Sequence, residues 1–104
     1  MMNTTYFLKR LRYLIEAQQP FIAYWHEHGY GILRTGEVNM YLPDGRGGRK
    51  LTTCRPSVAS VKKLRRQIER MRRDWVTRGS LLAVEYDGAS LAAEGDPQLL
   101  EALE

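Results

Sequence analysis

The sequence predicts an α+β fold, in which a small antiparallel sheet packs against an N-terminal helix and a long basic central helix. Apolar residues recur at spacings of three and four over residues 4–18 and 57–78, which is typical of helices. Shorter apolar or alternating runs lie between and after these segments, and such runs are typical of strands. The length of 104 residues fits a single domain, residues 1–104, and we expect its helices on one face of the sheet.

The first helix, residues 4–18, carries one apolar stripe and ends before Pro20. The residue before a proline avoids the helical region, so this proline marks a boundary. The stripe consists of Phe7, Leu8, Leu11, Leu14 and Ile15. A continuous stripe of this kind indicates that the helix covers a core.

Residues 21–53 are expected to form an antiparallel meander of about three strands. The aromatic and β-branched run at 21–25 predicts a buried strand, and Gly29 and Gly31 indicate a turn or bulge around Tyr30.

The strand over residues 37–42 alternates cleanly. Val38, Met40 and Leu42 point one way, which predicts a half-buried strand. Tyr41 points the other way and is the best exposed aromatic candidate for stacking on a nucleic-acid base. After the turn at Pro43, the chain is expected to return as a strand at 51–53.

The long helix, residues 57–78, has a narrow apolar seam, with Ser57 suited to cap its first turn. The seam consists of Val61, Leu64, Ile68, Met71 and Trp75. A seam this narrow fits a helix lying on a sheet, and it also fits pairing with a second copy in a homodimer.

The end of the chain predicts a hairpin and a short helix. Residues 81–86 read as a strand, and the Asp87-Gly88 turn leads into a return over 89–93. Asp96 and Pro97 suit the cap and the first position of a helix.

Charge is divided unevenly along the chain. The first 78 residues hold all 16 Lys and Arg residues and 6 of the 12 acidic residues, and the last 26 hold the other 6 acidic residues. The basic part therefore suits an anionic partner, unless the acidic end, residues 85–104, folds back and shields the basic helix. The chain has no long apolar run and no secretory signal pattern, and its single cysteine favours a reducing, cytoplasmic location.

The basic helix provides the main candidate contacts, because seven of the twelve residues from Lys62 to Arg73 are Lys or Arg. They are Lys62, Lys63, Arg65, Arg66, Arg70, Arg72 and Arg73. Arginine can grip two phosphate oxygens with its planar fork, so we expect the arginines at 65, 66, 72 and 73 to contribute most. An acidic protein surface would suit the same charges, and so would a solvated helix that uses arginine only for its helix propensity.

The loop between the two later strands adds three cations, Arg46, Arg49 and Lys50, among three glycines. Glycine lets a backbone approach a partner closely, and the cations attract phosphate. The spacing fits neither a P-loop nor a dinucleotide-binding motif. A solvent-exposed loop kept soluble by its charge is the alternative.

Signals for catalysis and metal binding are weak. His26 and His28 would share one face of a strand, but paired ligand motifs are missing and only Cys54 offers a further soft ligand. A turn with two polar histidines is the better interpretation. No catalytic motif is present, so we expect no enzyme, no metal and no cofactor.

These features predict a small non-enzymatic protein that contacts the phosphate backbone of nucleic acid through the basic helix and the Gly/Arg loop. The alternative is an accessory inhibitor of the kind carried by phages and mobile elements, for example one that blocks a CRISPR or recombination complex. Such a protein would bind a protein site on a larger nucleoprotein complex, either with the basic helix or with acidic residues that mimic phosphates.

Overall fold

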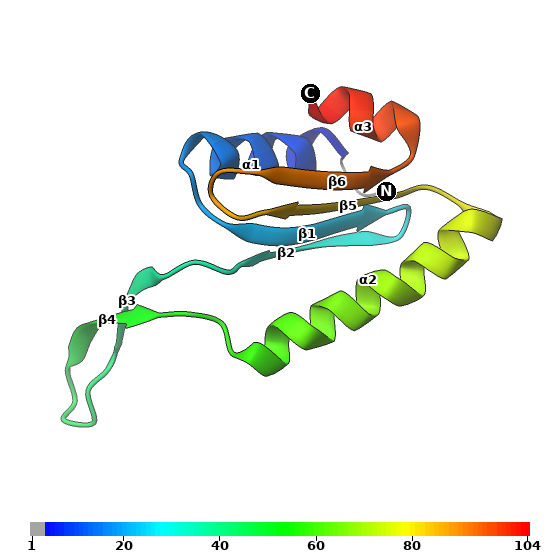
Figure 1. The fold of residues 1–104 in the computed structure, drawn as a ribbon. Helices are drawn as coiled ribbons and strands as arrows, with labels where there is room; N and C mark the ends of the chain where they lie inside the picture. The colour runs from blue at the N-terminus through cyan, green and yellow to red at the C-terminus, as the bar shows by residue number, and fades with distance from the viewer. Residues whose placement is uncertain (1–3) are drawn as a thin grey trace.

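The structure of the protein, a computed structural model, describes residues 4–104, with the side chains of residues 76–78 excepted. Within these residues the chain forms three helices and six strands (Figure 1). The elements are α1 (Thr4–Glu16), β1 (Phe21–His26), β2 (Gly29–Arg34), β3 (Val38–Pro43), β4 (Arg49–Cys54), α2 (Val58–Arg78), β5 (Leu81–Tyr86), β6 (Leu91–Gly95) and α3 (Pro97–Leu103). The predicted α+β class and the order of its helices and strands are confirmed.

Four strands form the main sheet in the order β2-β1-β5-β6, and every neighbouring pair is antiparallel. The pairing of β1 with β5 joins segments about 60 residues apart, with Phe21 opposite Tyr86. Because α2 connects β4 to β5, it must cross the sheet to bring β5 beside β1.

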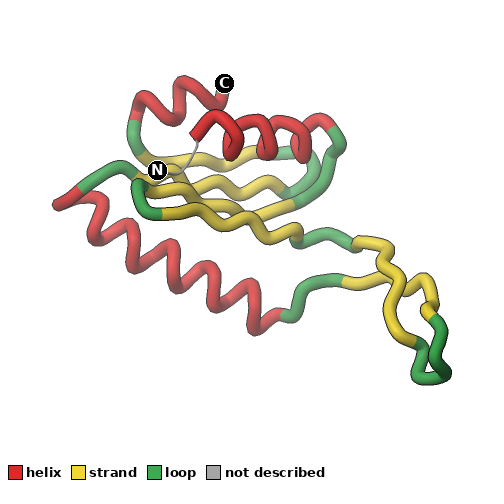
Figure 2. Tube along the Cα trace, turned by 180° about the vertical axis from the view of Figure 1, so that it is seen from behind, coloured by secondary structure: helices red, strands yellow, loops and turns green. Residues whose placement is uncertain are grey.

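Helices cover both faces of this sheet, so the expectation of helices on one face is wrong. Figures 1 and 2 show α1 and α3 on one side and α2 on the other. The reason lies in β1 and β5, whose central residues are apolar on both faces: Ile22 and Ala83 face α2, whereas Ala23 and Val84 face α1. A strand that is apolar on both faces requires cover on both.

The larger core lies between the sheet and the α1–α3 layer. It combines the buried stripe of α1 with alternate residues of the central strands and Leu103 of α3. Its buried residues are Phe7, Leu8, Leu11, Leu14, Phe21, Ala23, Trp25, Leu82, Val84, Tyr86 and Leu103. This layer fixes the sheet on which α2 rests.

The smaller core lies under α2. Ile68 is buried against Ile22 and Ala83, and half-buried seam residues surround it: Val61, Leu64 and Met71. The seam predicted from the sequence therefore packs on the chain's own sheet, and a homodimer paired through this seam is not supported.

The expected meander of about three strands is wrong, because β3 and β4 leave the main sheet and pair only with each other. We call residues 38–54 the arm. It projects from the body in Figures 1 and 2, and the molecule measures 52 × 27 × 27 Å. The radius of gyration is 15.6 Å, against about 13 Å for a compact chain of this length.

The arm separates because it has no apolar face large enough to pack. The alternating apolar residues of β3 lie opposite Lys50, Thr52 and Cys54 of β4. Met40 is 48% exposed, although the alternation in residues 37–42 places it on the side predicted to be buried. Two strands without a partner layer gain little from burial, so they extend into solvent.

The turn between β1 and β2 lies at Glu27–His28, before the predicted position around Tyr30. Gly31 belongs to β2, opposite Tyr24. A Cβ at Gly31 would lie 2.6 Å from Cε1 of Tyr24, so the glycine makes room for the ring rather than for a turn.

Gly95 ends β6 with φ +143°, and a Cβ there would overlap the carbonyl oxygen of Leu81. The same carbonyl accepts a hydrogen bond from the backbone N–H of Asp96 at 2.9 Å. The side chain of Asp96 in turn caps α3 by accepting from the N–H of Gln98 at 2.9 Å. The tight approach of β6 to β5 thus positions the last helix.

Candidate functional site

The outer side of α2 holds the densest group of exposed cations. The helix begins as predicted, since Ser57 Oγ accepts a hydrogen bond from the N–H of Ser60 at 3.1 Å. Successive residues turn by about 100°, so five cations fall within an arc of about 100° opposite the buried Ile68. These outer cations are Lys62, Lys63, Arg66, Arg70 and Arg73.

None of the outer cations has a carboxylate oxygen within 4.0 Å among the residues that the structure describes. Four of them, Lys62, Arg66, Arg70 and Arg73, follow one another at spacings of four, four and three. This row is about 16 Å long, which equals the rise of about five phosphates of one strand, measured along the axis of a duplex.

Two of the four arginines expected to contribute most are held by carboxylates instead. Arg65 donates to both oxygens of Glu85, at 3.0 and 2.6 Å. The hydrogen bond to Glu85 raises the pKa of Arg65 above its ordinary value. Arg72 pairs with Glu69 of the same helix and with Glu94 of β6. The acidic end therefore neutralises part of the helix, and leaves the outer cations exposed.

The sequence carried a signal for this division. On a helical wheel Arg65 and Arg72 lie about 60° and 40° from Ile68, at the border of the apolar seam. Glu85 and Glu94 lie on the α2 side of β5 and β6, where their carboxylates meet these arginines. The ion pairs could not be predicted from the sequence, because the position of β5 and β6 beside the helix was not known.

An open cleft of about 380 Å³ lies between α2 and β5–β6. The residues of these ion pairs form its walls. Its floor is formed by small side chains, including Ala83, Ala92 and Ala93. Because arginines and glutamates line it together and bind one another, the cleft offers no single charge to a ligand.

The loop of the arm is organised by Asp44. Its Oδ1 accepts from the backbone N–H of Arg46 at 2.7 Å and of Gly48 at 3.2 Å. No described carboxylate forms an ion pair with the side chains of Arg46, Arg49 or Lys50, and all three residues are exposed. The tip of the arm therefore presents a second group of cations, beyond the N-terminal end of α2 (Figure 1).

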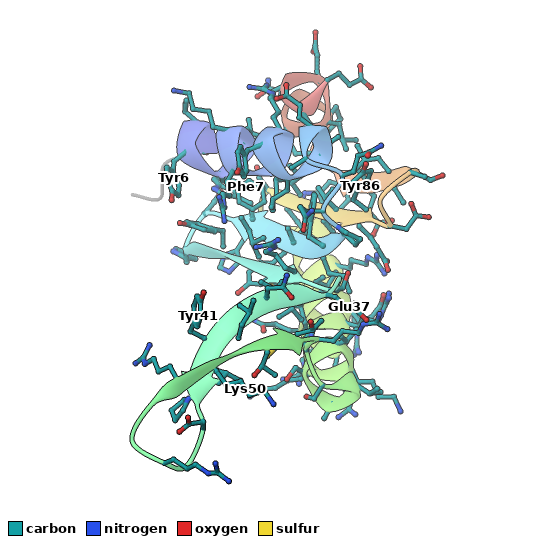
Figure 3. The ribbon with its side chains drawn as sticks, turned by 90° about the vertical axis from the view of Figure 1, so that its left-hand side faces the viewer. Tyr6, Phe7, Glu37, Tyr41, Lys50 and Tyr86 are labelled. Carbon is teal, nitrogen blue, oxygen red and sulfur yellow. The ribbon has the colours of Figure 1, made fainter. Side chains whose placement is uncertain are left out.

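The two sides of the arm differ in character. Tyr41 lies directly opposite Leu51, and the two side chains are 65% and 53% exposed. Lys50 projects from the other side of the arm (Figure 3). The exposed position expected for Tyr41 is confirmed, whereas its role in binding stays a prediction.

The base of the arm is fixed by an ion pair between Arg55 and Glu37, 2.7 Å apart. These residues flank the first strand pair of the arm, in which Val38 faces Cys54. Arg55 thus pairs with a residue of its own chain, and no local pattern predicts this partner 18 residues away.

The histidines lie at the end of β1, near the C-terminal end of α2, and help to line a cavity of about 270 Å³. His28 stands in the turn, and its backbone N–H donates to Nδ1 of His26 at 3.1 Å. No group of three potential ligands for a metal is found among the described residues. Cys54 lies apart from them, half-buried at the end of β4.

Neither protein-family models, nor curated proteins, nor solved structures give a match to this chain. Within residues 4–104, no helix combines the length and the apolar character that crossing a bilayer requires.

Proposed function

We propose that this is a non-enzymatic protein that binds nucleic acid through the phosphate backbone, with α2 and the arm as its contact surface. The observation that carries the proposal is the row of outer cations, which stand opposite the buried seam without carboxylate partners in the described part of the chain. We place this activity in the cytoplasm, in keeping with the single free cysteine.

The arrangement of the outer cations argues against a role in solubility alone. Lys62–Arg66 and Arg66–Arg70 are like-charge pairs at a spacing of four, and each costs a helix about 0.2–0.5 kcal/mol. Glutamate and glutamine have similar helix propensity and would remove this repulsion. A partner that supplies negative charge along the helix offsets the repulsion.

The chemistry of the surface favours contacts that do not depend on sequence. Lysine and arginine reach phosphates of any sequence and also bind the O6 and N7 atoms of guanine, whereas adenine is read by the amides of asparagine and glutamine. Gln67, the glutamine of α2, donates to the hydroxyl of Tyr24 at 3.1 Å and is engaged within the fold.

Two double variants of equal net charge test the proposal. Arg66→Gln with Arg70→Gln removes two outer cations, and Arg65→Gln with Arg72→Gln removes the two arginines that are bound to carboxylates. Binding to a fluorescent mixed-sequence duplex at about 0.1 M salt should fall by about tenfold or more in the first variant and much less in the second. Equal losses in both variants would reject α2's outer side as the contact surface.

A second candidate function is an accessory inhibitor that docks on a protein site of a nucleoprotein complex. The exposed apolar side chains of Met40 and Leu51 on the arm favour it, because phosphate binding does not require them. A nuclease-treated pull-down distinguishes the two: a stoichiometric protein partner that is lost in Met40→Ser with Leu51→Ser supports the inhibitor, and loss of all bound material after nuclease supports nucleic acid.

A further inference from the structure

We propose that the Tyr41 side of the arm stacks on an unpaired base, so that single-stranded nucleic acid is the preferred ligand of this surface. This inference rests on the proposed function and names its substrate class. It starts from an exposed aromatic ring that no packing within the described chain explains.

The register of the arm places three residue pairs on the Tyr41 side. Asn39 and Thr53 lie nearest the body and are joined by a 2.9 Å hydrogen bond. The Tyr41–Leu51 pair follows, and the pair of Pro43 and Arg49 lies nearest the tip. The ring of Tyr41 and its neighbour Leu51 are thus followed by Arg49, two residues further along the strand, which corresponds to about 7 Å.

This spacing suits one nucleotide of a single strand. A base stacks on the ring of Tyr41 while Arg49 holds a phosphate of the same strand. In a duplex both faces of each base are covered by its neighbours, so a base reaches Tyr41 only after it has been unstacked.

The other exposed tyrosines are already in contact with neighbouring groups. The ring of Tyr6 lies 6.4 Å from that of Tyr30, and Arg10 lies 5.5 Å above the ring of Tyr13. Tyr41 has no such partner among the described residues.

A second copy of the chain is a poorer occupant than a base. The six residues of this side include no carboxylate, so a second copy would bury Arg49 without an acidic partner from the same surface. Burying an unpaired charge is costly, whereas the phosphate of a nucleotide pairs with it.

The test compares a mixed-sequence DNA strand of about 20 nucleotides with the duplex of the same sequence, by fluorescence anisotropy at one salt concentration. The full chain should bind the single strand more tightly. Tyr41→Leu should weaken binding to the single strand by about fivefold to a hundredfold with a small effect on the duplex. Tyr41→Phe should bind like the unmodified chain, because stacking requires the ring and not the hydroxyl.

Tyr13→Leu is the matched control, because Tyr13 is similarly exposed, at 60%, and lies on α1 across the sheet from α2. Equal affinity for strand and duplex, with no selective loss in Tyr41→Leu, overturns the inference and leaves the proposed function standing. Loss of self-association in Tyr41→Leu, measured by sedimentation, overturns it in favour of a second copy. Absence of binding to either probe overturns the proposed function as well.

Discussion

The outer cations make a quantitative prediction for the dependence of binding on salt. Each phosphate neutralised on duplex DNA releases counterions, and the slope of log affinity against log salt concentration is about −0.9 per contact. The perturbation is the removal of Arg66 and Arg70 as glutamines, which leaves three of the five outer cations.

The magnitude follows from the number of side chains in contact. Five contacts on α2 give a slope of about −4.5, so the affinity should fall about 500-fold between 50 and 200 mM salt. Three contacts give about −2.7, and the same change in salt should reduce affinity about 40-fold. Contacts from the three cations of the arm would steepen both slopes equally.

The assay is a salt titration of binding to a duplex, measured by fluorescence anisotropy, for the unmodified chain and for both double variants. The variant at Arg65 and Arg72 should keep the slope of the unmodified chain, since Glu85 and Glu94 already neutralise these residues. A slope near zero for the unmodified chain, or the same reduction in both variants, would refute the reasoning.

Three predictions concern stability. Gly95→Ala should lower the free energy of unfolding by about 2–3 kcal/mol in urea denaturation, because of its positive φ and its contact with β5; Gly29→Ala, with open space around it, should change stability by less than about 1 kcal/mol. Glu85→Gln should cost less than about 1 kcal/mol in the same assay, because its ion pair with Arg65 is half-exposed. Hydrogen bonds from backbone N–H groups of its turn lower the pKa of Asp87 below its ordinary value, so its contribution to stability is complete above about pH 4 and is lost as the pH falls further. Asp87→Asn should therefore lose less stability on acidification than the unmodified chain, measured by denaturation at about pH 5 and 3.

The helices and most of their ends could be predicted because their signals are local, although α1 ends at Glu16, two residues before the predicted end. Ser57 and Asp96 cap helices through hydrogen bonds to residues two or three positions away, and both caps were visible in the sequence. The hairpin turn at Asp87 was visible for the same reason. Its returning strand begins at Leu91, two residues after the predicted start.

The arm could not be predicted because its separation depends on distant pairing. The neighbours of β1 are β2 and β5, and β5 comes from about 60 residues further along the chain. The alternation of apolar and polar residues over 37–42 indicated a strand, but it did not indicate the sheet to which the strand belongs. The polar partner strand 49–54, which gives the hairpin no core, was the available sign that it would stand alone.

The outer cations of α2 could be predicted only as part of a larger group of basic residues. Arg65 and Arg66 are equivalent in the sequence pattern, although Arg65 binds Glu85 and Arg66 faces solvent. The rotation of the helix about its axis decides between them. Ile68 is the seam residue that is buried, at 5% exposure, and it fixes that rotation.

The arm leaves and rejoins the body at almost the same place. Val38 and Cys54 are paired, and the ion pair between Glu37 and Arg55 joins the flanking residues just outside them. Because the two ends of the arm lie side by side, the arm joins the rest of the fold as a closed loop, and its length does not change the distance between its ends. A hairpin of different length or sequence can therefore replace the arm without changing the strand pairing of the main sheet.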